Sequence, residues 1–289
     1  MNSTLTVEAA GLFTTVQDLG RAGYAHLGIS LAGAADTLAL RIGNLLVGND
    51  ANAPALEMTA SGGSFRFEHD AVVALTGATC DAPMWRPFET RHVRLGPLAG
   101  ARSYLCVRGG IDVPLVLGSA SMHPATGIGG RPLRRGDVLR LGSRAVHDAR
   151  WAGTPWRPQC GGRLRVTAGP QSDWFDNGVF FSSVYKVDPD SNRAGLRLRG
   201  AAIEAPRAQL LTEGVSLGAV QVPAGGQPIV LFVDQTTTGG YPKIANVVTA
   251  DLWRVGQLRP GDEVSFELVS IEHALKLLRE QERMLAKLL

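Results

Sequence analysis

Short stretches in which apolar and polar residues alternate, or in which a few apolar residues run together, recur along most of the chain. Thr4 to Glu8 alternates strictly, whereas Arg102 to Val107 is a compact, mainly apolar run followed by glycines. A period of two is typical of a β-strand with one buried face, and short apolar runs between turn residues are typical of buried strands. The pattern predicts strands over 4–8, 55–58, 64–67, 71–76, 102–107 and 230–233, and another that begins at 164.

Two segments show the spacing of an α-helix instead. After Asp36, apolar residues recur every three or four positions up to Val47, and Asp36 is a suitable N-cap. The tail 270–289 has one apolar face, and Ser270 can cap it. We expect the tail's own domain to cover that face, with a second copy or a different subunit as alternatives. The residues of the face are Ile271, Ala274, Leu275, Leu278, Leu285 and Leu288.

The length and the turn residues favour a β-rich protein of two domains. A chain of 289 residues can bury two cores, and 35 glycines and 16 prolines indicate many turns between short strands. Periodicity is absent over about 143–163, where Trp-Pro and Gly-Gly pairs cluster. We therefore predict an N-terminal domain over 1–150, a linker over 151–163 and a C-terminal domain over 164–289.

An internal repeat supports two halves of similar β architecture. Leu133 to Leu141 matches Leu258 to Phe266, each with a Gly-Asp turn between apolar flanks, and the same ungapped interval places Leu105 to Val107 on Val230 to Phe232. In that alignment the Gly109-Gly110 loop corresponds to the loop that begins at Asp234. The run from Leu164 also resembles the opening strand.

Charge and cysteine content limit the classes of partner. The net charge of +3 is small and its cations are scattered among acids, which argues against a nucleic-acid partner. No apolar run is long enough to span a membrane, and residues 1–7 lack the features of a secretion signal. Three widely spaced cysteines fit a reducing compartment, so a cytoplasmic location is expected. Cys106 is predicted to be a small buried thiol.

The stretch from Val230 to Ala245 carries the most chemistry. A buried strand breaks there into a loop with a carboxylate (Asp234), three consecutive threonine hydroxyls (236–238), two glycines and the ammonium of Lys243. Glycines let backbone N–H groups approach a ligand closely. The alternative is an ordinary turn with a solvated lysine.

A second polar stretch, 10–26, is predicted to be a loop that could form one wall of a site. Gln17, Asp18, Arg21 and His26 fall within it. Asp18 and Arg21 could equally pair with each other, and His26 could be a structural histidine.

Five distinctive motifs follow one another at 11–21, 44–49, 75–78, 109–114 and 237–245. Together they resemble the KipA family, also described as the C subunit of 5-oxoprolinase or as allophanate hydrolase subunit 2-like. The family is related to the carboxyltransferase part of urea amidolyase and is often labelled a biotin-dependent carboxyltransferase. The resemblance covers nearly the whole chain up to the terminal helix.

The resemblance implies two cyclophilin-like β-barrel domains with a few short helices and a C-terminal helix. It implies a hydrolase component that works with a KipI-like partner, the B subunit of 5-oxoprolinase, is active only with its partner subunits and is compatible with a dimer of heterodimers. In such complexes a third subunit joins in the ATP-dependent opening of 5-oxoproline to glutamate. The chain has no Gly-x-x-x-x-Gly-Lys-Ser/Thr loop, so ATP would be held by another device or with the partner.

Carried over to this chain, the resemblance assigns catalytic roles to Asp234, Lys243, Asp18 and His26, and no metal. Three motifs depart from the family pattern. Thr236 stands where Gln is usual, and Ala120 where Arg is usual. Residues 192–198 read Asn-Arg-Ala-Gly-Leu-Arg-Leu where Asp-Arg-Met-Gly-Tyr-Arg-Leu is usual. Losing an Arg removes a bidentate anion clamp, which leaves the substrate open. The substrate-binding residues would be Gln17, Arg21, Arg193, Thr237, Thr238, Gly239, Gly240 and Tyr241.

Two other functions stay open. The chain could be the carboxyltransferase half of a urea carboxylase-like enzyme, with biotin on a separate carrier because the chain has no Met-Lys attachment signature. It could also be a non-enzymatic regulator that binds a kinase inhibitor of the KipI type. The first hypothesis, a 5-oxoprolinase-type subunit acting on 5-oxoproline or a similar small amide, is the one we adopt.

Overall fold

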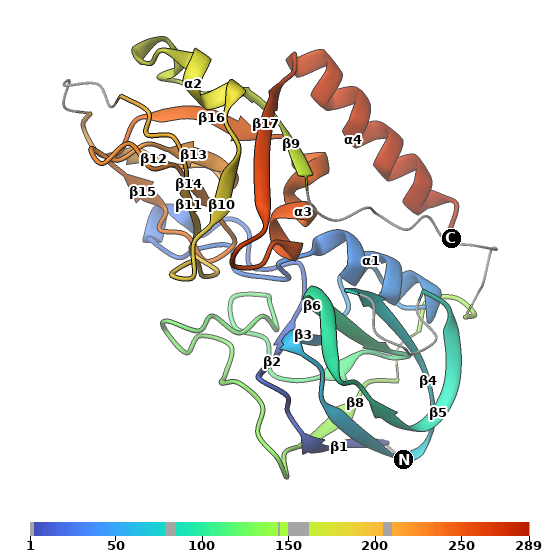
Figure 1. Ribbon diagram of the computed structural model, residues 1–289. Coiled ribbons are helices and arrows are strands. Elements are labelled where there is room, and N and C mark those ends of the chain that lie inside the picture. The colour runs from blue at the N-terminus through green and yellow to red at the C-terminus, as the bar shows by residue number, and fades with distance from the viewer. Residues whose placement is uncertain (1–2, 79–84, 144, 150–161, 205–209, 289) are drawn as a thin grey trace. The chain divides into compact units, whose positions relative to one another are not determined.

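The computed structural model describes residues 3–78, 85–143, 145–149, 162–204 and 210–288. Contacts divide the chain into two compact units, drawn in Figure 1. Unit 1 comprises Met1–Arg21, Ala32–Pro158 and Arg283–Leu289, and unit 2 comprises Ala22–Leu31 and Gln159–Glu282. The predicted linker lies outside the described residues except for its last two, which begin a strand. The domain bounds 1–150 and 164–289 stay a prediction.

Unit 1 is an eight-stranded sheet with the order β2-β3-β6-β4-β1-β8-β7, in which β5 pairs with β4. Its core holds fully buried side chains such as Leu5, Leu56, Phe65 and Leu105. The strands are β1 Thr4–Ala9, β2 Phe13–Gln17, β3 Ala55–Ser61, β4 Ser64–Gly77, β5 Pro87–Arg94, β6 Pro97–Val107, β7 Ile111–Asp112 and β8 Val138–Leu141.

Two sequence predictions in unit 1 need correction. The stretch predicted as a loop contains β2, whose threonines are buried. The buried hydroxyl of Thr14 is satisfied because it donates to the carbonyl of Ala10 at 2.5 Å. The strands predicted over 64–67 and 71–76 form one strand, β4. The polar residues between them sit at a shift in register against β5, between Arg66 and Ala71, rather than in a turn.

Helix α1, Thr37–Leu46, begins where the sequence predicts. The Asp36 carboxylate accepts a hydrogen bond from the Ala39 N–H at 2.8 Å, so the N-cap is confirmed. Asn44 and Asn49 are buried at the other end of the helix. Asn49 donates to the Val107 carbonyl at 2.8 Å and accepts from the Gly109 N–H at 2.7 Å, which fixes the end of β6 against the helix.

Unit 2 is a closed barrel with the order β10-β11-β14-β13-β16-β9-β17. Parallel pairing of β9 with β17 closes it, and Phe180 stacks on Phe266 in its core with ring centroids 4.5 Å apart. The strands are β9 Gly162–Ala168, β10 Tyr185–Val187, β11 Gly195–Arg199, β13 Ala219–Gln221, β14 Ile229–Leu231, β16 Lys243–Val247 and β17 Glu263–Leu268; β12 Glu213–Gly214 pairs with β15 Thr238–Gly239. The helices are η1 Ala25–Leu27, η2 Ser172–Trp174, α2 Asn177–Ser182, η3 Thr249–Asp251 and α3 Leu252–Gln257.

The predicted mainly-β fold with two barrel-like sheets is confirmed, and the repeat is visible in its turns. Asp137 accepts from the Arg134 N–H at 2.8 Å, as Asp262 does from the Arg259 N–H at 2.8 Å. In these turns the Gly136 N–H donates to the Val7 carbonyl of β1, and the Gly261 N–H donates to the Val187 carbonyl of β10. The counterpart of the opening strand is therefore β10. The sequence instead suggested the strand from 164, which is β9 and pairs parallel with β17.

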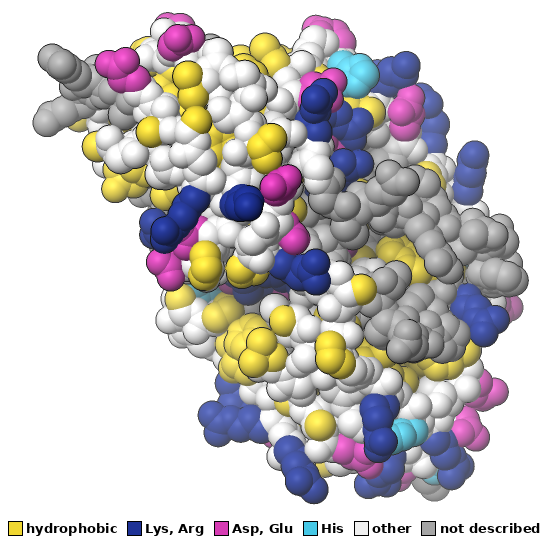
Figure 2. All heavy atoms as spheres, in the orientation of Figure 1, with side chains coloured by type: hydrophobic (Ala, Val, Ile, Leu, Met, Phe, Trp, Pro, Cys, Tyr) yellow, Lys and Arg dark blue, Asp and Glu magenta, His cyan; other side chains and the backbone are white. Residues whose placement is uncertain are grey.

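Helix α4, Ile271–Ala286, follows the predicted Ser270 cap, whose hydroxyl accepts from the His273 N–H at 3.2 Å. Only part of its apolar face is covered: Leu285 is 3% exposed, whereas Ile271 is 66% exposed. Figure 2 shows charged side chains of both signs over this helix. No described helix is long and apolar enough to cross a membrane.

Candidate functional site

Lys243, the first residue of β16, lies at the centre of a polar cluster in unit 2. Its side chain is only 3% exposed, and its ammonium lies 2.5 Å from a carboxylate oxygen of Glu213 on β12. Gln171 donates to the same oxygen at 3.0 Å. Gln171 also exchanges hydrogen bonds with the backbone of Lys243, accepting at 3.1 Å and donating at 3.2 Å. We call Lys243, Glu213 and Gln171 the lysine cluster.

Burial in the lysine cluster is unequal. The Glu213 side chain is 41% exposed while its cationic partner is enclosed, so only the carboxylate faces solvent. The hydrogen bond from Lys243, and then that from Gln171, lower the pKa of Glu213 below its usual range. The cluster therefore favours the ionised form of Glu213.

The predicted threonine and glycine loop forms one side of the lysine cluster. Gly239 pairs with Glu213 across β12 and β15, and the Tyr241 carbonyl lies 3.4 Å from the Lys243 ammonium. A Cβ atom at Gly239 would lie 2.7 Å from the Gln221 amide nitrogen, so a larger residue here would displace the Gln221 side chain. The Tyr241 side chain is 49% exposed and Gly240 is exposed, so the loop is accessible. Thr237 and Thr238 precede these residues in the same loop.

Asp234 and Arg193, both predicted, meet in a buried pair. The guanidinium contacts the two carboxylate oxygens at 2.6 and 3.2 Å, and the side chains are 9% and 6% exposed for Arg193 and Asp234. The Asp234 N–H also donates to the Arg193 carbonyl at 2.9 Å. The pair fixes the start of the loop that leads to Lys243.

Asp18 and its neighbours form a separate cluster in unit 1. The Asp18 carboxylate is 2% exposed and accepts from the Ser119 hydroxyl at 2.6 Å and the Ser121 hydroxyl at 2.5 Å. It also accepts backbone N–H groups of Gly20 at 2.8 Å and Ala120 at 2.7 Å. Four donors on one carboxylate hold the 119–121 segment against the end of β2.

Gln17 and Arg21 strengthen the same attachment. Gln17 donates to the Met122 carbonyl at 2.9 Å, and Arg21 donates to the Ser121 carbonyl. Ala120, at the position where the family pattern has Arg, is fully buried in the core of unit 1. The structure thus brings Gln17, Asp18 and Arg21 together, in a different unit from the lysine cluster.

His26 lies in η1, which groups with unit 2. Its side chain is exposed, and within the described residues it makes no hydrogen bond or ion pair with the lysine cluster. Among the residues that the structure describes, no three His, Cys, Asp or Glu side chains are placed to hold a metal ion.

Three residues near Lys243 were not predicted from the sequence. Glu213 and Gln171 reach the lysine through strand pairing and a turn, and Gln221 lies opposite Lys243 in the pairing of β13 with β16. Gln171 directly follows a Gly-Pro pair after an apolar strand, a signal that could have been used. Glu213 carries no local signal.

These features define a chain of two β-barrel-like units with a polar cluster in each. The family described as carboxyltransferase domain, subdomain A and B, matches residues 27–268, and the chain belongs to this family. It is 44% identical to the C subunit of 5-oxoprolinase from Escherichia coli, over 96% of each chain, and 37% identical to that from Haemophilus influenzae, over 93% and 92%. It also superposes on urea amidolyase of K. lactis with a TM-score of 0.92 and 32% identity, covering 99% of this chain and 20% of that chain.

Proposed function

We propose that this chain is the C subunit of a 5-oxoprolinase, a complex that uses ATP to open 5-oxoproline or a similar small amide. The observation that carries the proposal is the 44% identity to the Escherichia coli protein over 96% of both chains. Because the alignment covers almost the whole relative, the function in its name belongs to the part that matches this chain. We place the complex in the cytoplasm, with the KipI-like B subunit as the partner. We propose that two such heterodimers assemble into a dimer.

The chemistry of amide activation supports a role for Lys243. Transfer of a phosphoryl group from ATP to the amide oxygen would place negative charge on oxygen, and a fixed ammonium stabilises such charge best when water is excluded. Lys243 is fixed by Glu213 and by the Tyr241 carbonyl.

The buried Arg193–Asp234 pair has a positioning role in this proposal. Because both carboxylate oxygens of Asp234 contact Arg193, the pair sets the path of the loop that carries Thr237, Thr238 and Lys243. Asp18, Gln17 and Arg21 act in the same way in unit 1, where they hold the 119–122 segment. We assign the exposed His26 no step in the reaction.

The partner subunits would supply what this chain lacks. ATP would be held with the partner, because the chain contains no Gly-x-x-x-x-Gly-Lys-Ser/Thr loop. Exposed apolar residues at the N-terminal end of α4, such as Ile271, are available for contacts in an assembly.

The test is reconstitution of the complex from purified subunits. With ATP present, the complete complex is expected to consume 5-oxoproline and release glutamate and phosphate, whereas this chain alone is inactive. Lys243→Met should lower the rate without preventing assembly. A fully assembled complex without ATP-dependent consumption of 5-oxoproline would contradict the proposal and would favour a regulatory role through the KipI-like partner.

A second candidate function, carboxyl transfer from biotin, is favoured by the TM-score of 0.92 with urea amidolyase and by the family match. It requires biotin on a separate carrier. The same subunits, incubated with a carrier protein whose biotin has been carboxylated beforehand by a biotin carboxylase with ATP and labelled bicarbonate, would then transfer the label to a urea-like acceptor. Labelled product without 5-oxoproline turnover would replace the first proposal by the second.

A further inference from the structure

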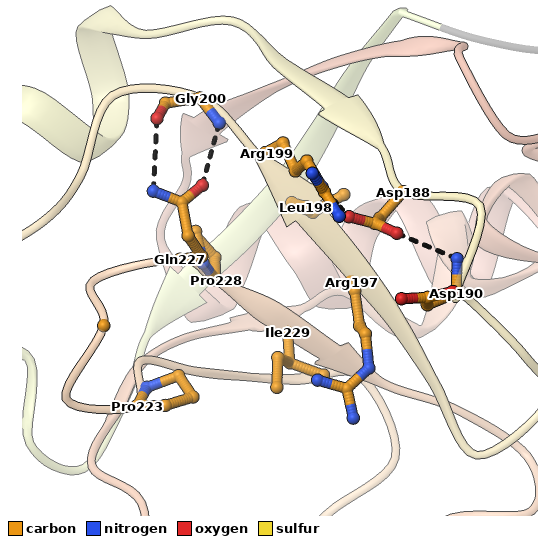
Figure 3. Close-up of a pocket in the computed structure, with 11 residues that line it drawn as sticks. Asp188, Asp190, Arg197, Leu198, Arg199, Gly200, Pro223, Gln227, Pro228 and Ile229 are labelled. Carbon is orange, nitrogen blue, oxygen red and sulfur yellow. Dashed lines mark hydrogen bonds and ion pairs between the residues drawn. The ribbon is translucent and has the colours of Figure 1, made fainter.

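A hollow of about 520 Å³ lies on the outer face of the unit 2 barrel, and no predicted site residue lines it. Leu196 and Leu198 of β11 are buried. Arg197 and Arg199 alternate with them along the strand and therefore point away from the barrel interior. The hollow is bounded by the β10–β11 corner, by β11 and by the loop that leads into β14. Figure 3 shows Arg197 extending beside Ile229, with Asp190 and Pro223 on other sides.

The charges that line the hollow are not all paired. Asp188 is 5% exposed, forms an ion pair with Arg199 and accepts from the Asp190 N–H at 2.8 Å, so the Asp188–Arg199 pair is neutral. By contrast, the Arg197 guanidinium has no ion-pair partner within the described residues, and neither does the Asp190 carboxylate. One cation and one anion are therefore available to a bound molecule.

The unpaired arginine stands on a fixed backbone. Its N–H donates to the Ser191 hydroxyl at 3.0 Å, and its carbonyl accepts from the Asp188 N–H at 2.9 Å. The guanidinium that extends from this backbone can present two parallel N–H donors, the geometry that matches a carboxylate.

The remaining walls are also built before any ligand arrives. The Gln227 amide accepts from the Gly200 N–H at 2.9 Å and donates to the Gly200 carbonyl at 3.2 Å, as Figure 3 shows. Pro223, Pro228 and Ile229 add apolar surface. Gly226 has a φ of +71°, and a Cβ there would lie 2.5 Å from the Ile203 carbonyl oxygen, so glycine allows this loop to pack closely.

We propose that this hollow binds a small carboxylic acid that also carries a nitrogen donor, in the size range from an amino acid to a dipeptide. Its carboxylate pairs with Arg197, its N–H group bonds to Asp190, and its aliphatic body contacts Pro223 and Ile229. A preformed concave site with a few convergent polar groups and apolar walls is typical of small-molecule binding. The site is separate from the lysine cluster, and the inference does not depend on the proposed function.

The experiment is a titration of the isolated full-length chain. Binding is measured by calorimetry and by the NMR signals of arginine side chains. The probes are 5-oxoproline, cyclopentanecarboxylate, which has a similar ring without the nitrogen, and inorganic phosphate. Binding of 5-oxoproline should shift the Arg197 signal. Arg197→Gln should weaken the binding of 5-oxoproline at least tenfold. Arg259→Gln, which alters a half-exposed arginine of the same unit, should leave this binding unchanged.

Asp190→Asn provides the second comparison. This variant should weaken the binding of 5-oxoproline but not that of cyclopentanecarboxylate, because only 5-oxoproline has an N–H group for Asp190. Equal binding of all probes by the original chain and by Arg197→Gln would overturn the proposal, as would phosphate binding as tightly as 5-oxoproline or no binding at millimolar concentrations.

Titrations in the Lys243→Met background separate this site from the lysine cluster. The Arg197 shift should persist there, and its loss would assign the binding to the lysine cluster and overturn the proposal. The reconstituted turnover assay is independent, because it measures ATP-dependent product from the complex and not binding to one chain.

Discussion

The Lys243 ammonium lies 2.5 Å from Glu213, yet the lysine is 3% exposed and the glutamate 41% exposed. The pair thus places a buried ammonium against a carboxylate that solvent can reach. Such an arrangement holds a positive charge in a fixed place at low cost, because the carboxylate keeps part of its hydration while it compensates the ammonium.

Glu213→Gln should lower the turnover of the reconstituted complex, because Lys243 loses the charge that fixes it. We expect a fall of about 10- to 100-fold, and about 100- to 1000-fold for Lys243→Met, within the range for removal of one stabilising donor. Steady-state kinetics would measure both. Glu263→Gln, at an exposed glutamate of the same unit, is the matched control. Unchanged turnover in Lys243→Met would remove this lysine from the reaction.

The pKa of Glu213 offers a test that does not need activity. Lys243 and Gln171 stabilise its ionised form and lower its pKa, so Gln171→Leu should raise the pKa and Lys243→Met should raise it further. As pH falls through the lowered pKa, Glu213 takes up a proton and its ion pair with Lys243 is lost. NMR titration of the side-chain carboxyl carbons would show the order of these shifts. A pKa that stays low in Lys243→Met would contradict the assigned cause.

Asp234→Asn should destabilise unit 2 strongly. Asp234→Asn removes the charge of the carboxylate that contacts Arg193 at 2.6 and 3.2 Å. Breaking a buried pair in this way costs about 3–5 kcal/mol, whereas an exposed pair contributes about 0–1 kcal/mol. Arg193→Met combined with Asp234→Leu should recover part of the loss, since apolar side chains then replace both members of the ion pair. Denaturant unfolding of the single and double variants measures the coupling.

The matched control for that cycle is Arg131 with Asp137, a bidentate pair whose arginine is 52% exposed. Its coupling energy should be well below that of Arg193 with Asp234. Equal coupling in the two pairs would show that burial does not determine the strength of the Asp234 interaction.

Sequence reasoning found those parts of the fold and site that are local in the chain. The Asp36 cap, the α1 spacing and the strand from Thr4 all follow from neighbouring residues. Strand β2 was missed because its buried positions include Thr14 and Thr15, whose hydroxyl groups are satisfied by hydrogen bonds that the sequence does not display.

The same limit applies to the candidate site. Lys243 and Asp234 share one loop and could be identified together. Glu213 comes from β12, a two-residue strand with no periodic pattern, and reaches Lys243 through the pairing of β12 with β15. Arg193 was suggested by the family resemblance, and its pairing with Asp234 depends on β11 and β14 lying side by side. Contacts between distant strands leave no periodic signal in either segment.

Asp18→Asn should loosen the 119–121 segment of unit 1. An asparagine oxygen cannot accept all four hydrogen bonds, and its NH₂ group would face donors, so we expect a loss of about 2–4 kcal/mol. Hydrogen exchange of the Ala120 amide should accelerate, because that N–H donates directly to Asp18 at 2.7 Å. The control is Asp112→Asn, at an exposed position of unit 1. Unchanged Ala120 exchange would show that the segment is held by other contacts.

Tyr104 makes stability depend on alkaline pH. It is fully buried and donates to Glu57 at 2.6 Å, and burial, followed by the charge of Glu57, raises its pKa well above the usual value of 10.0. The folded state therefore resists losing this proton more than the unfolded state does. The stabilisation is complete below pH about 10 and declines as pH rises from there towards the raised pKa.

Absorbance at 295 nm should therefore show a tyrosine that ionises only as unit 1 unfolds, and Tyr104→Phe should remove this contribution. The contribution of Tyr185 in unit 2, whose pKa is also raised by burial, should remain. Tyr104→Phe should also lose about 1–2 kcal/mol at neutral pH, because the Asp36 N–H donates to the Tyr104 hydroxyl at 2.8 Å and Glu57 loses a donor. Tyr241→Phe, at the exposed tyrosine of unit 2, should retain the contribution of Tyr104. Ionisation of Tyr104 before unfolding would mean that Glu57 does not hold the phenol in its neutral form.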